Sequence, residues 1–449
     1  MEVIVLAGGL GTRLRSVVAD MPKCLAPVGD KPFLGWLLEW LGQYPVNHVV
    51  FSVGYLKEQV IDYVQSREWP FAYDFAVEES PLGTGGGIRL ALEKCREKQV
   101  FVVNGDTFYP VDLNALPFCG PVTVALKPMQ DFDRYGAVEV SSGLSASARP
   151  APAENYFFGR CQKNQFPAGN ATPTHADADA TAEHTSVPQH ASASVMPDLI
   201  GHLLITAFHE KQPCRKGLIN GGVYAIDRSL LDLSGLPEKF SFEKDVLEPG
   251  AAKGQIGGWV SDAYFIDIGV PEDYETAQWA IPGWFAVRKA FQAVLAADAD
   301  TLFLDRDGVL NRHLEGDYVK SWKEWEWMPG ILEALAKWSR KFRYMVLVTN
   351  QRGVGRGVMS DADLGLVHAR MLEAIDAAGG RLDLVLVCTA VDDADPRRKP
   401  NTGMFQEACA LLPDIDPARC IMVGDSPKDA LFAARSGMQF ILLSPEGVS

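Results

Sequence analysis

Glycines and two cations near the start of the chain could together hold a triphosphate. Apolar residues 3–6 lead into the string Ala7-Gly8-Gly9-Leu10-Gly11-Thr12-Arg13. Glycine lets the backbone bend where a side chain would clash, so its N–H groups can face a phosphate. Arg13 adds a fork of donors, and Lys23 follows as a second cation. This pattern predicts a nucleoside triphosphate site after a strand; the alternative is an ordinary tight turn.

A carboxylate further along the chain could bind Mg²⁺. Apolar residues 100–103 are followed by Asn104-Gly105-Asp106. Ligands of parallel sheets bind at the carboxyl ends of the strands, and Mg²⁺ prefers carboxylate oxygens. The ion would bridge the triphosphate and offset charge during attack on the α-phosphate. A single Asp at a strand end can also be a simple turn residue.

The pair Asp305 and Asp307 could divide the work on a phosphate monoester. Apolar residues 302–304 precede Asp305-Arg306-Asp307-Gly308. The first carboxylate can attack phosphorus, and the second can protonate the leaving oxygen. A Mg²⁺ ion would keep these charges from repelling the substrate. Asp-x-Asp alone is a weak motif, because calcium-binding loops contain it as well.

Alternating strands and helices must position these groups. Residues 33–41 predict an apolar-faced helix, 48–53 a strand and 58–64 a helix. This order is typical of a parallel sheet with helices on both faces. The glycine-rich residues 83–87 predict a second loop that brings backbone close to a flat ligand; a helix start is the alternative.

The architecture restarts in the last third of the chain. Strands are predicted from residue 301, from 344 and from 421, so we expect an α/β protein with two doubly wound domains. Their predicted bounds are 1–280 and 300–449, with a helical connector over 281–299. Residues 141–200 are rich in Ala, Ser, Pro and Thr and show no helical or strand period. They predict a disordered insertion.

The composition of the 449-residue chain excludes some classes of protein. Its net charge of −15 argues against a nucleic-acid surface, which needs a basic stripe. The eight cysteines are scattered, which fits reduced thiols better than a disulfide framework. We find no signal peptide and no apolar run of about 18 residues that could span a membrane. These features predict a cytoplasmic protein. Small-molecule substrates are expected from the phosphate-binding motifs above, and a homo-oligomer remains open.

The first motif also carries a resemblance. Leu-Ala-Gly-Gly-x-Gly-Thr-Arg-Leu, followed by Pro-Lys-x-Leu-x-Pro-Val, resembles the sugar-1-phosphate nucleotidyltransferases, which release pyrophosphate. The resemblance continues to about residue 275 and implies a Rossmann-like, GT-A-like domain. It implies nucleotide contacts from Leu6, Gly8, Gly9, Gly11, Thr12, Gly83 and Thr84. It further implies catalytic cations Arg13 and Lys23, Mg²⁺ ligands Asp106 and Asp267, and sugar-phosphate contacts Glu210, Lys211, Asn220 and Glu243.

The C-terminal motifs resemble the haloacid dehalogenase superfamily phosphatases. The matching pieces are Asp305-Arg306-Asp307-Gly308, Thr349-Asn350-Gln351, Arg398-Lys399-Pro400 and Gly424-Asp425. The resemblance implies catalytic roles for Asp305, Asp307, Thr349 and Lys399. It also implies a Mg²⁺ site of Asp305, Asp425 and the backbone carbonyl of Asp307, and sugar-phosphate contacts from Asn350 and Arg398. Residues 349–399 leave no room for a separate cap domain.

One departure from the phosphatase pattern concerns zinc. Many members hold zinc in a Cys/His loop before Arg-Lys-Pro, but residues 388–399 contain one Cys and no His. A structural zinc site needs four ligands, so none is expected here.

The two resemblances together imply consecutive steps on one sugar. The phosphatase pieces are most similar to phosphatases of D-glycero-D-manno-heptose 1,7-bisphosphate and histidinol phosphate. The N-terminal pieces are most similar to guanylyltransferases that make GDP-D-glycero-α-D-manno-heptose. We therefore expect a bifunctional enzyme that removes a 7-phosphate and then transfers GMP from GTP. Alternatives are another sugar, such as mannose 1-phosphate, with a histidinol-phosphate-type phosphatase, or a nucleotide-sugar sensor without turnover.

Overall fold

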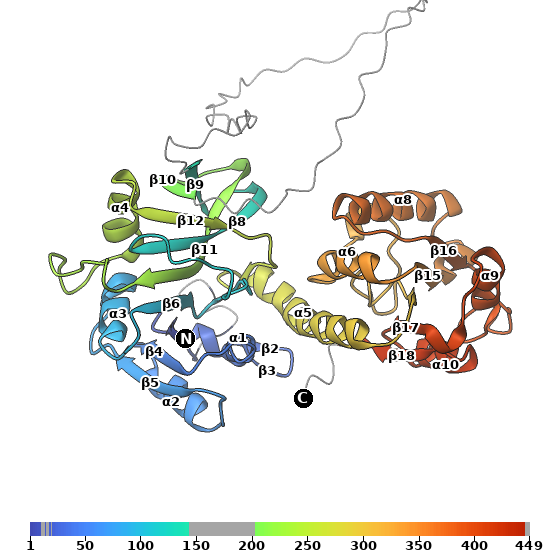
Figure 1. Ribbon diagram of the computed structural model, residues 1–449, viewed down its shortest axis with the longest axis horizontal. Coiled ribbons are helices and arrows are strands. Elements are labelled where there is room, and N and C mark those ends of the chain that lie inside the picture. Colours follow the sequence, from blue (N-terminus) through green and yellow to red (C-terminus); the bar gives the residue numbers. More distant parts are fainter. Residues whose placement is uncertain (10–13, 15–17, 19, 143–202, 445–449) are drawn as a thin grey trace, which may run out of the picture.

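The computed structural model describes residues 1–9, 14, 18, 20–142 and 203–444. These residues form two lobes that are joined by the long helix α5 (Pro271–Ala296) (Figure 1). Gly11, Thr12 and Arg13 lie outside the described residues, as does the predicted insertion from residue 143 onward. Residues 141 and 142, also assigned to that insertion, belong instead to the end of strand β9 (Gly136–Ser142).

A nine-stranded sheet forms the N-terminal lobe, in the order β5-β4-β1-β6-β11-β8-β12-β10-β9. Strands β5, β4, β1 and β6 run parallel, as predicted, and most pairs beyond β6 are antiparallel. Leu6 pairs with Ser52 and Asn104, so three parallel strands end at one edge. The other strands are β1 (Glu2–Leu6), β4 (His48–Val53), β5 (Ala72–Val77), β6 (Gln99–Asn104), β8 (Val122–Phe132), β10 (Leu203–Lys211), β11 (Cys214–Asp227) and β12 (Ile256–Val260).

Short helices cover this sheet. The helix predicted over residues 33–41 and the strand predicted over 48–53 are confirmed as α1 and β4. The helices are α1 (Phe33–Leu41), α2 (Lys57–Gln65), α3 (Gly83–Leu92) and α4 (Glu248–Ala252), with a 3-10 turn η1 (Lys23–Leu25) and a π-helical turn η2 (Glu243–Leu247). Two small ribbons complete the lobe, β2 (Pro27–Val28) with β3 (Lys31–Pro32) and β7 (Thr107–Phe108) with β13 (Ile266–Asp267).

Five parallel strands form the C-terminal lobe, in the order β16-β15-β14-β17-β18. They are β14 (Thr301–Leu304), β15 (Tyr344–Asn350), β16 (Leu384–Cys388), β17 (Cys420–Gly424) and β18 (Gln439–Leu442). The helices are α6 (Ile331–Lys341), α7 (Arg352–Gly355), α8 (Asp361–Ala377), α9 (Gly403–Leu411) and α10 (Pro427–Arg435), with 3-10 turns η3 (Trp322–Glu324) and η4 (Pro417–Arg419). The predicted second doubly wound unit is confirmed.

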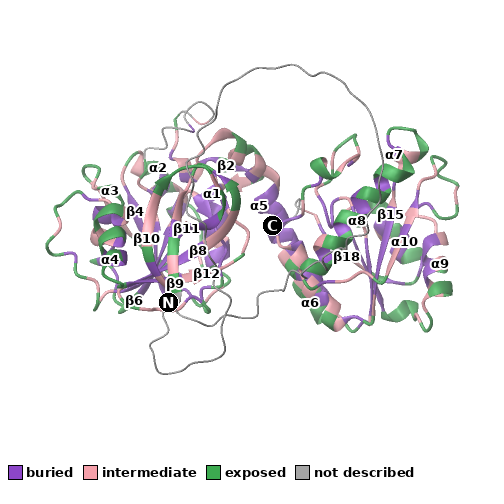
Figure 2. Ribbon diagram, turned by 90° about the horizontal axis from the view of Figure 1, so that it is seen from above, coloured by how far each residue is buried: buried purple, intermediate pink, exposed green. Residues whose placement is uncertain are grey.

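Helix α5 belongs to the cores of both lobes. Ile281 and Phe285 pack into the N-terminal core, whereas Ala290 and Val294 pack into the C-terminal core. The buried colour of Figure 2 accordingly runs through both sheets and along α5. The helix begins well before residue 281, where the connector is predicted, because Pro271 starts it with a fixed φ. No helix within the described ranges is long and apolar enough to cross a bilayer.

We predict that residues 143–202 can be replaced by a two-residue Asn-Gly turn with both activities retained. Ser142 and Leu203 are direct partners in the β9–β10 ladder, so a tight hairpin turn can join them. Pyrophosphate and phosphate release by the shortened, folded chain should match those of the full chain. Loss of either activity with an unchanged melting temperature would show that the segment contributes to that activity.

Candidate active sites

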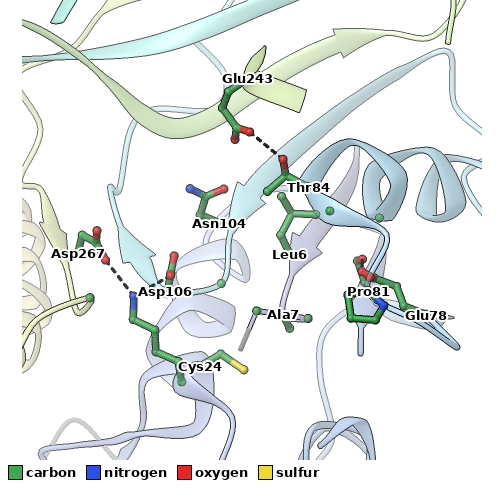
Figure 3. Close-up of a pocket in the computed structure, with 18 residues that line it drawn as sticks. Leu6, Ala7, Cys24, Glu78, Pro81, Thr84, Asn104, Asp106, Glu243 and Asp267 are labelled. Carbon is green, nitrogen blue, oxygen red and sulfur yellow. Dashed lines mark hydrogen bonds and ion pairs between the residues drawn. The ribbon is translucent and has the colours of Figure 1, made fainter. Parts of the chain in front are cut away.

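A cavity of about 490 Å³ opens at the edge of the sheet where β1 and β6 end. Leu6, Gly8 and Gly9 line it from β1 and the following turn. Gly83 and Thr84 line it from the start of α3, and Figure 3 shows Thr84 beside the tip of β1. Five of the seven predicted nucleotide contacts therefore share one cavity; the other two, Gly11 and Thr12, lie outside the described residues.

The prediction of a second glycine loop is wrong. Residues 83–87 are not a loop but the first turns of helix α3. Glycine has a low helix propensity, which is why the sequence favoured a loop. Packing explains why glycines occur in this helix: a Cβ on Gly85 would lie 2.2 Å from the ring of Phe240. Gly83, Thr84 and Gly87 of this helix still line the cavity.

Lys23 bridges the two predicted metal carboxylates of this cavity. Its Nζ lies 2.7 Å from Asp106 Oδ2 and 3.2 Å from Asp267 Oδ1, as Figure 3 shows. Burial would lower the pKa of Lys23, but the charges of Asp106 and Asp267 outweigh it and raise that pKa. Burial, together with the charge of Asp106, raises the pKa of Asp267. Asp106 and Asp267 thus hold the cation Lys23 between them, and their hard oxygens also fit Mg²⁺.

The four predicted sugar-phosphate contacts of this lobe are not brought together. Glu243 lines the cavity. Asn220 lies on β11, where its side chain donates to the Tyr224 hydroxyl and accepts from the Gly222 N–H. Glu210 and Lys211 are exposed at the end of β10, next to β9, and are not among the residues that line the cavity. Roles for Asn220, Glu210 and Lys211 stay predictions.

Sequence reasoning missed Glu78, which lies in the same cavity. Its Oε1 accepts from the Ser52 hydroxyl at 3.1 Å and its Oε2 accepts from the Leu82 N–H at 2.9 Å. These bonds fix the carboxylate against the glycines: a Cβ on Gly87 would lie 2.8 Å from Glu78 Oε1. The only signal was position, since Glu78 follows strand β5 at the same sheet edge.

A second cavity, of about 230 Å³, opens where β14 and β17 end in the C-terminal lobe. Lys399 is nearly fully buried there, with Nζ 2.8 Å from Asp305 Oδ1 and 2.6 Å from Asp429 Oδ1. Burial would lower the pKa of Lys399, but these two charges raise it. Burial also raises the pKa of Asp305, and Lys399 only partly offsets this.

The same cavity gathers oxygen ligands for a metal ion. In the described part of the chain, the one group of three or more His, Cys, Asp or Glu side chains that could share an ion is Asp305, Asp425 and Asp429, whose ligand atoms lie within 4.8 Å of one another. Asp305 and Asp425 are as predicted, and Asp429 is an addition. Gly308 makes this close approach possible: its φ is +85° and a Cβ would lie 1.9 Å from Asp425 Oδ2. Hard oxygens fit Mg²⁺.

Asp307 lines the cavity, and neighbouring donors hold its carboxylate in place. Its carboxylate accepts from Arg306, from Asn311 Nδ2 at 2.9 Å and from Gln351 Nε2 at 2.8 Å. Burial would raise the pKa of Asp307, but the Arg306 charge and these bonds lower it. Asp307 is therefore a carboxylate at neutral pH in the substrate-free protein. Asp307 must therefore acquire a proton before it can protonate a leaving oxygen, as predicted.

The remaining predicted residues of the phosphatase site divide into two groups. Asn350 and Arg398 line the cavity. Thr349 does not: it is fully buried, and its hydroxyl accepts from Gln351 Nε2. Arg398 is held by Asp393 Oδ1, 2.8 Å from its Nε, and donates through Nη1 to the Ala390 carbonyl. The loop before Lys399, for which no zinc is expected, thus positions an arginine through an ion pair.

Asp429 and Gln351 are among the polar residues of this site that the sequence did not predict. Asp429 is the N3 residue of a capping box with Ser426, and the Ser-x-x-Asp spacing at the start of α10 is the signal that could have revealed it. Gln351 is fully buried between Asp307 and Thr349. Its role follows from a contact 44 residues apart in the chain, which no local pattern indicates.

Buried His368 on α8 supports the clamp on Asp307 and predicts acid sensitivity. Its Nε2 lies 3.3 Å from Arg306 Nη1. Burial and the Arg306 charge lower the pKa of His368 to about 4. The unfolded chain, with a His pKa near 6.5, then binds the proton first, so stability is lost as the pH falls from about 6.5 to about 4.

We expect the wild type to lose about 2 kcal/mol of unfolding free energy between pH 7 and pH 5 from this one group. His368→Gln keeps an acceptor for Arg306 but does not titrate, so it should lose that much less over the same interval. Urea denaturation at both pH values, followed in the C-terminal lobe, measures the difference. Equal losses in both proteins would contradict a neutral buried His368.

Comparisons with known proteins match the two lobes separately. Residues 3–116 match the family model of the MobA-like NTP transferase domain, and residues 396–447 match that of the HAD-hydrolase-like proteins. A D-glycero-alpha-D-manno-heptose 1-phosphate guanylyltransferase of Aneurinibacillus thermoaerophilus is 35% identical over 283 residues, which are 62% of this chain and 97% of that protein.

Two phosphatases are similar to the C-terminal part. A D-glycero-alpha-D-manno-heptose-1,7-bisphosphate 7-phosphatase of Mycobacterium tuberculosis is 41% identical over 28% of this chain and 68% of its own length. A D-glycero-beta-D-manno-heptose-1,7-bisphosphate 7-phosphatase of Bordetella bronchiseptica is 39% identical over 30% of this chain and 75% of its own length. The chain thus belongs to the D-glycero-α-D-manno-heptose 1-phosphate guanylyltransferase family in its N-terminal part and to the heptose-1,7-bisphosphate 7-phosphatase family in its C-terminal part.

Proposed function

We propose that the chain is a bifunctional enzyme that converts a heptose 1,7-bisphosphate into GDP-heptose. The observation that carries the proposal is that one chain holds two separate cavities, each with a lysine paired to two carboxylates: Lys23 in one and Lys399 in the other. The relatives of the two parts act on the 7-phosphate and on the 1-phosphate of the same sugar. The phosphatase step comes first, because the transferase needs the 1-phosphate and the finished donor carries no 7-phosphate.

The phosphatase step follows from the cavity around Lys399. An Asp305 oxygen attacks the phosphorus of the 7-phosphate, the bond from phosphorus to the sugar oxygen breaks, and an aspartyl-phosphate forms. Lys399 offsets the charge of the transferred group, and Asp429 holds Lys399 in place. Asp307 takes up a proton from solvent when the anionic substrate binds, gives it to the sugar oxygen as the bond breaks, and regains one from the water that releases phosphate. Asp305, Asp425 and the backbone carbonyl of Asp307 would hold Mg²⁺, which supplies charge neutralisation, and Asp429 lies close enough to add a further oxygen.

The transferase step follows from the cavity around Lys23. An oxygen of the sugar 1-phosphate attacks the α-phosphorus of GTP, and the bond to pyrophosphate breaks. Lys23 supplies positive charge beside the triphosphate. Asp106 and Asp267 would hold Mg²⁺, which supplies further charge neutralisation. Glu243 reaches the cavity from η2 and can accept from a sugar hydroxyl.

Glu78 accounts for a preference for guanine. Guanine carries adjacent N1–H and N2–H₂ donors, which a single carboxylate can accept together, whereas adenine presents an acceptor at N1. The carboxylate of Glu78 is held beside the start of α3 by Ser52 and by the Leu82 N–H. A fixed acceptor pair rejects a base without matching donors, because the carboxylate would then be left unpaired.

We predict that Glu78→Gln lowers kcat/KM for GTP by about 10- to 100-fold, since one acceptor oxygen becomes a donor. ITP lacks the N2 amino group and so provides the matched substrate. The wild type should prefer GTP over ITP, and Glu78→Gln should lose most of that preference. An unchanged GTP/ITP ratio in the variant would place the base elsewhere.

The whole proposal is tested with heptose 1,7-bisphosphate, GTP and Mg²⁺ supplied to the intact chain. Phosphate should appear first, followed by pyrophosphate and GDP-heptose. Asp305→Asn removes the nucleophile and should release no phosphate, yet it should still turn over heptose 1-phosphate. Asp106→Ala should do the reverse, and each variant serves as the control for the other. GDP-heptose 7-phosphate accumulating with Asp305→Asn would refute the proposed order.

Both anomers of heptose 1,7-bisphosphate belong in the same experiment. The guanylyltransferase relative acts on the α form, whereas the two phosphatase relatives differ in the anomer that they carry in their names. We propose the α form for this chain, because the product of the first step must suit the second. Nucleotide sugar formed from the β form alone would overturn that choice.

A further inference from the structure

Thr84 is the residue of the N-terminal cavity whose contacts least fit its predicted role. The hydroxyl lies in the cavity wall, where a base contact was expected. Instead it donates to Glu243 Oε2 at 2.7 Å and accepts from the Phe242 N–H at 2.9 Å. A hydroxyl has one proton and two lone pairs. The proton of Thr84 and one of its lone pairs are therefore already used.

We propose that Thr84 is a positioning residue for Glu243 and sets the affinity for the sugar phosphate, not for the nucleotide. This inference rests on the proposed function, in which Glu243 accepts from a sugar hydroxyl. Glu243 Oε2 is held from two sides, by Thr84 at 2.7 Å and by the Ser241 hydroxyl at 2.8 Å. Its Oε1 has no partner among these bonds and can accept from the substrate. Figure 3 shows the bond between Glu243 and Thr84.

The backbone around Thr84 explains why this contact is fixed. The Phe240 N–H donates to the Leu82 carbonyl at 3.0 Å, and the Gly85 N–H donates to the Phe240 carbonyl at 3.1 Å. Gly83 allows this approach, since its φ is +75° and a Cβ would lie 2.5 Å from the Phe240 oxygen. Segments 82–85 and 240–243 are therefore tied together by hydrogen bonds, with Thr84 at their contact.

Arg89, on the next turn of α3, also bonds to the segment that precedes Phe240. Its guanidinium donates to the carbonyls of Leu236 and Glu238 at 3.1 and 3.0 Å. It also lies over the ring of Phe240, with 5.1 Å between the guanidinium carbon and the ring centroid. The first turns of α3 are thus bonded to residues 236–240, which lead into Glu243. A change at Thr84 should release the carboxylate without moving the helix.

The test compares Thr84→Val with Thr84→Ser in steady-state assays of both substrates. Thr84→Val keeps the shape but loses the hydroxyl, so we expect KM for heptose 1-phosphate to rise about tenfold with KM for GTP within twofold of wild type. Thr84→Ser keeps the hydroxyl and should restore the wild-type KM. Thr123→Val removes a buried threonine hydroxyl on β8, whose partners are the Cys119 backbone groups, and controls for a general loss of packing.

A double-mutant cycle separates this role from a direct contact. If Thr84 acts through Glu243, adding Thr84→Val to Glu243→Ala should leave kcat/KM for heptose 1-phosphate unchanged. A raised KM for GTP with an unchanged sugar KM, or additive losses in the cycle, would overturn the inference. Should Thr84→Val fail to fold, Ser241→Ala removes the other donor to the same oxygen, and an unchanged sugar KM there would overturn it equally. A wild type that makes no GDP-heptose would refute the proposed function instead.

Discussion

Both cavities depend on one physical constraint: carboxylates placed together at the ends of strands need a cation. Lys23 meets this need between Asp106 and Asp267, and Lys399 meets it between Asp305 and Asp429. An isolated buried charge costs several kcal/mol, and a paired one far less. The glycines, the strand register and the capping of α10 all serve to bring these opposite charges within reach of one another.

The paired charges are buried to different degrees in the two lobes. Lys399 and Asp429 are almost completely buried, so their pairing fixes the phosphatase site before substrate arrives. Lys23 and its partners are more open to solvent, which suits a cavity that must admit a nucleotide and a sugar. Preorganisation is therefore strongest where a covalent intermediate is proposed to form.

The sequence was informative wherever a pattern is local. The helix over residues 33–41 has apolar residues on a helical face, and the strands before Asp106 and Asp305 are short apolar runs, so their type and position could be predicted. The loop predicted over 83–87 was wrong because tertiary packing against Phe240 overrides the low helix propensity of glycine. Glu78 and Gln351 could not be predicted, since each depends on one distant partner, Ser52 and Asp307, which lie 26 and 44 residues away in the chain.

Helix α5 gives the fused chain a property that its separate relatives do not need. Ile281 and Phe285 complete one core, and Ala290 and Val294, less than three turns later, complete the other. A cut within α5 would end the helix between two cores that it packs against in turn, and the freed helix ends would expose apolar surface, which is a route to aggregation. Dividing the chain there would therefore require new residues that cap the two helix ends and cover these apolar faces.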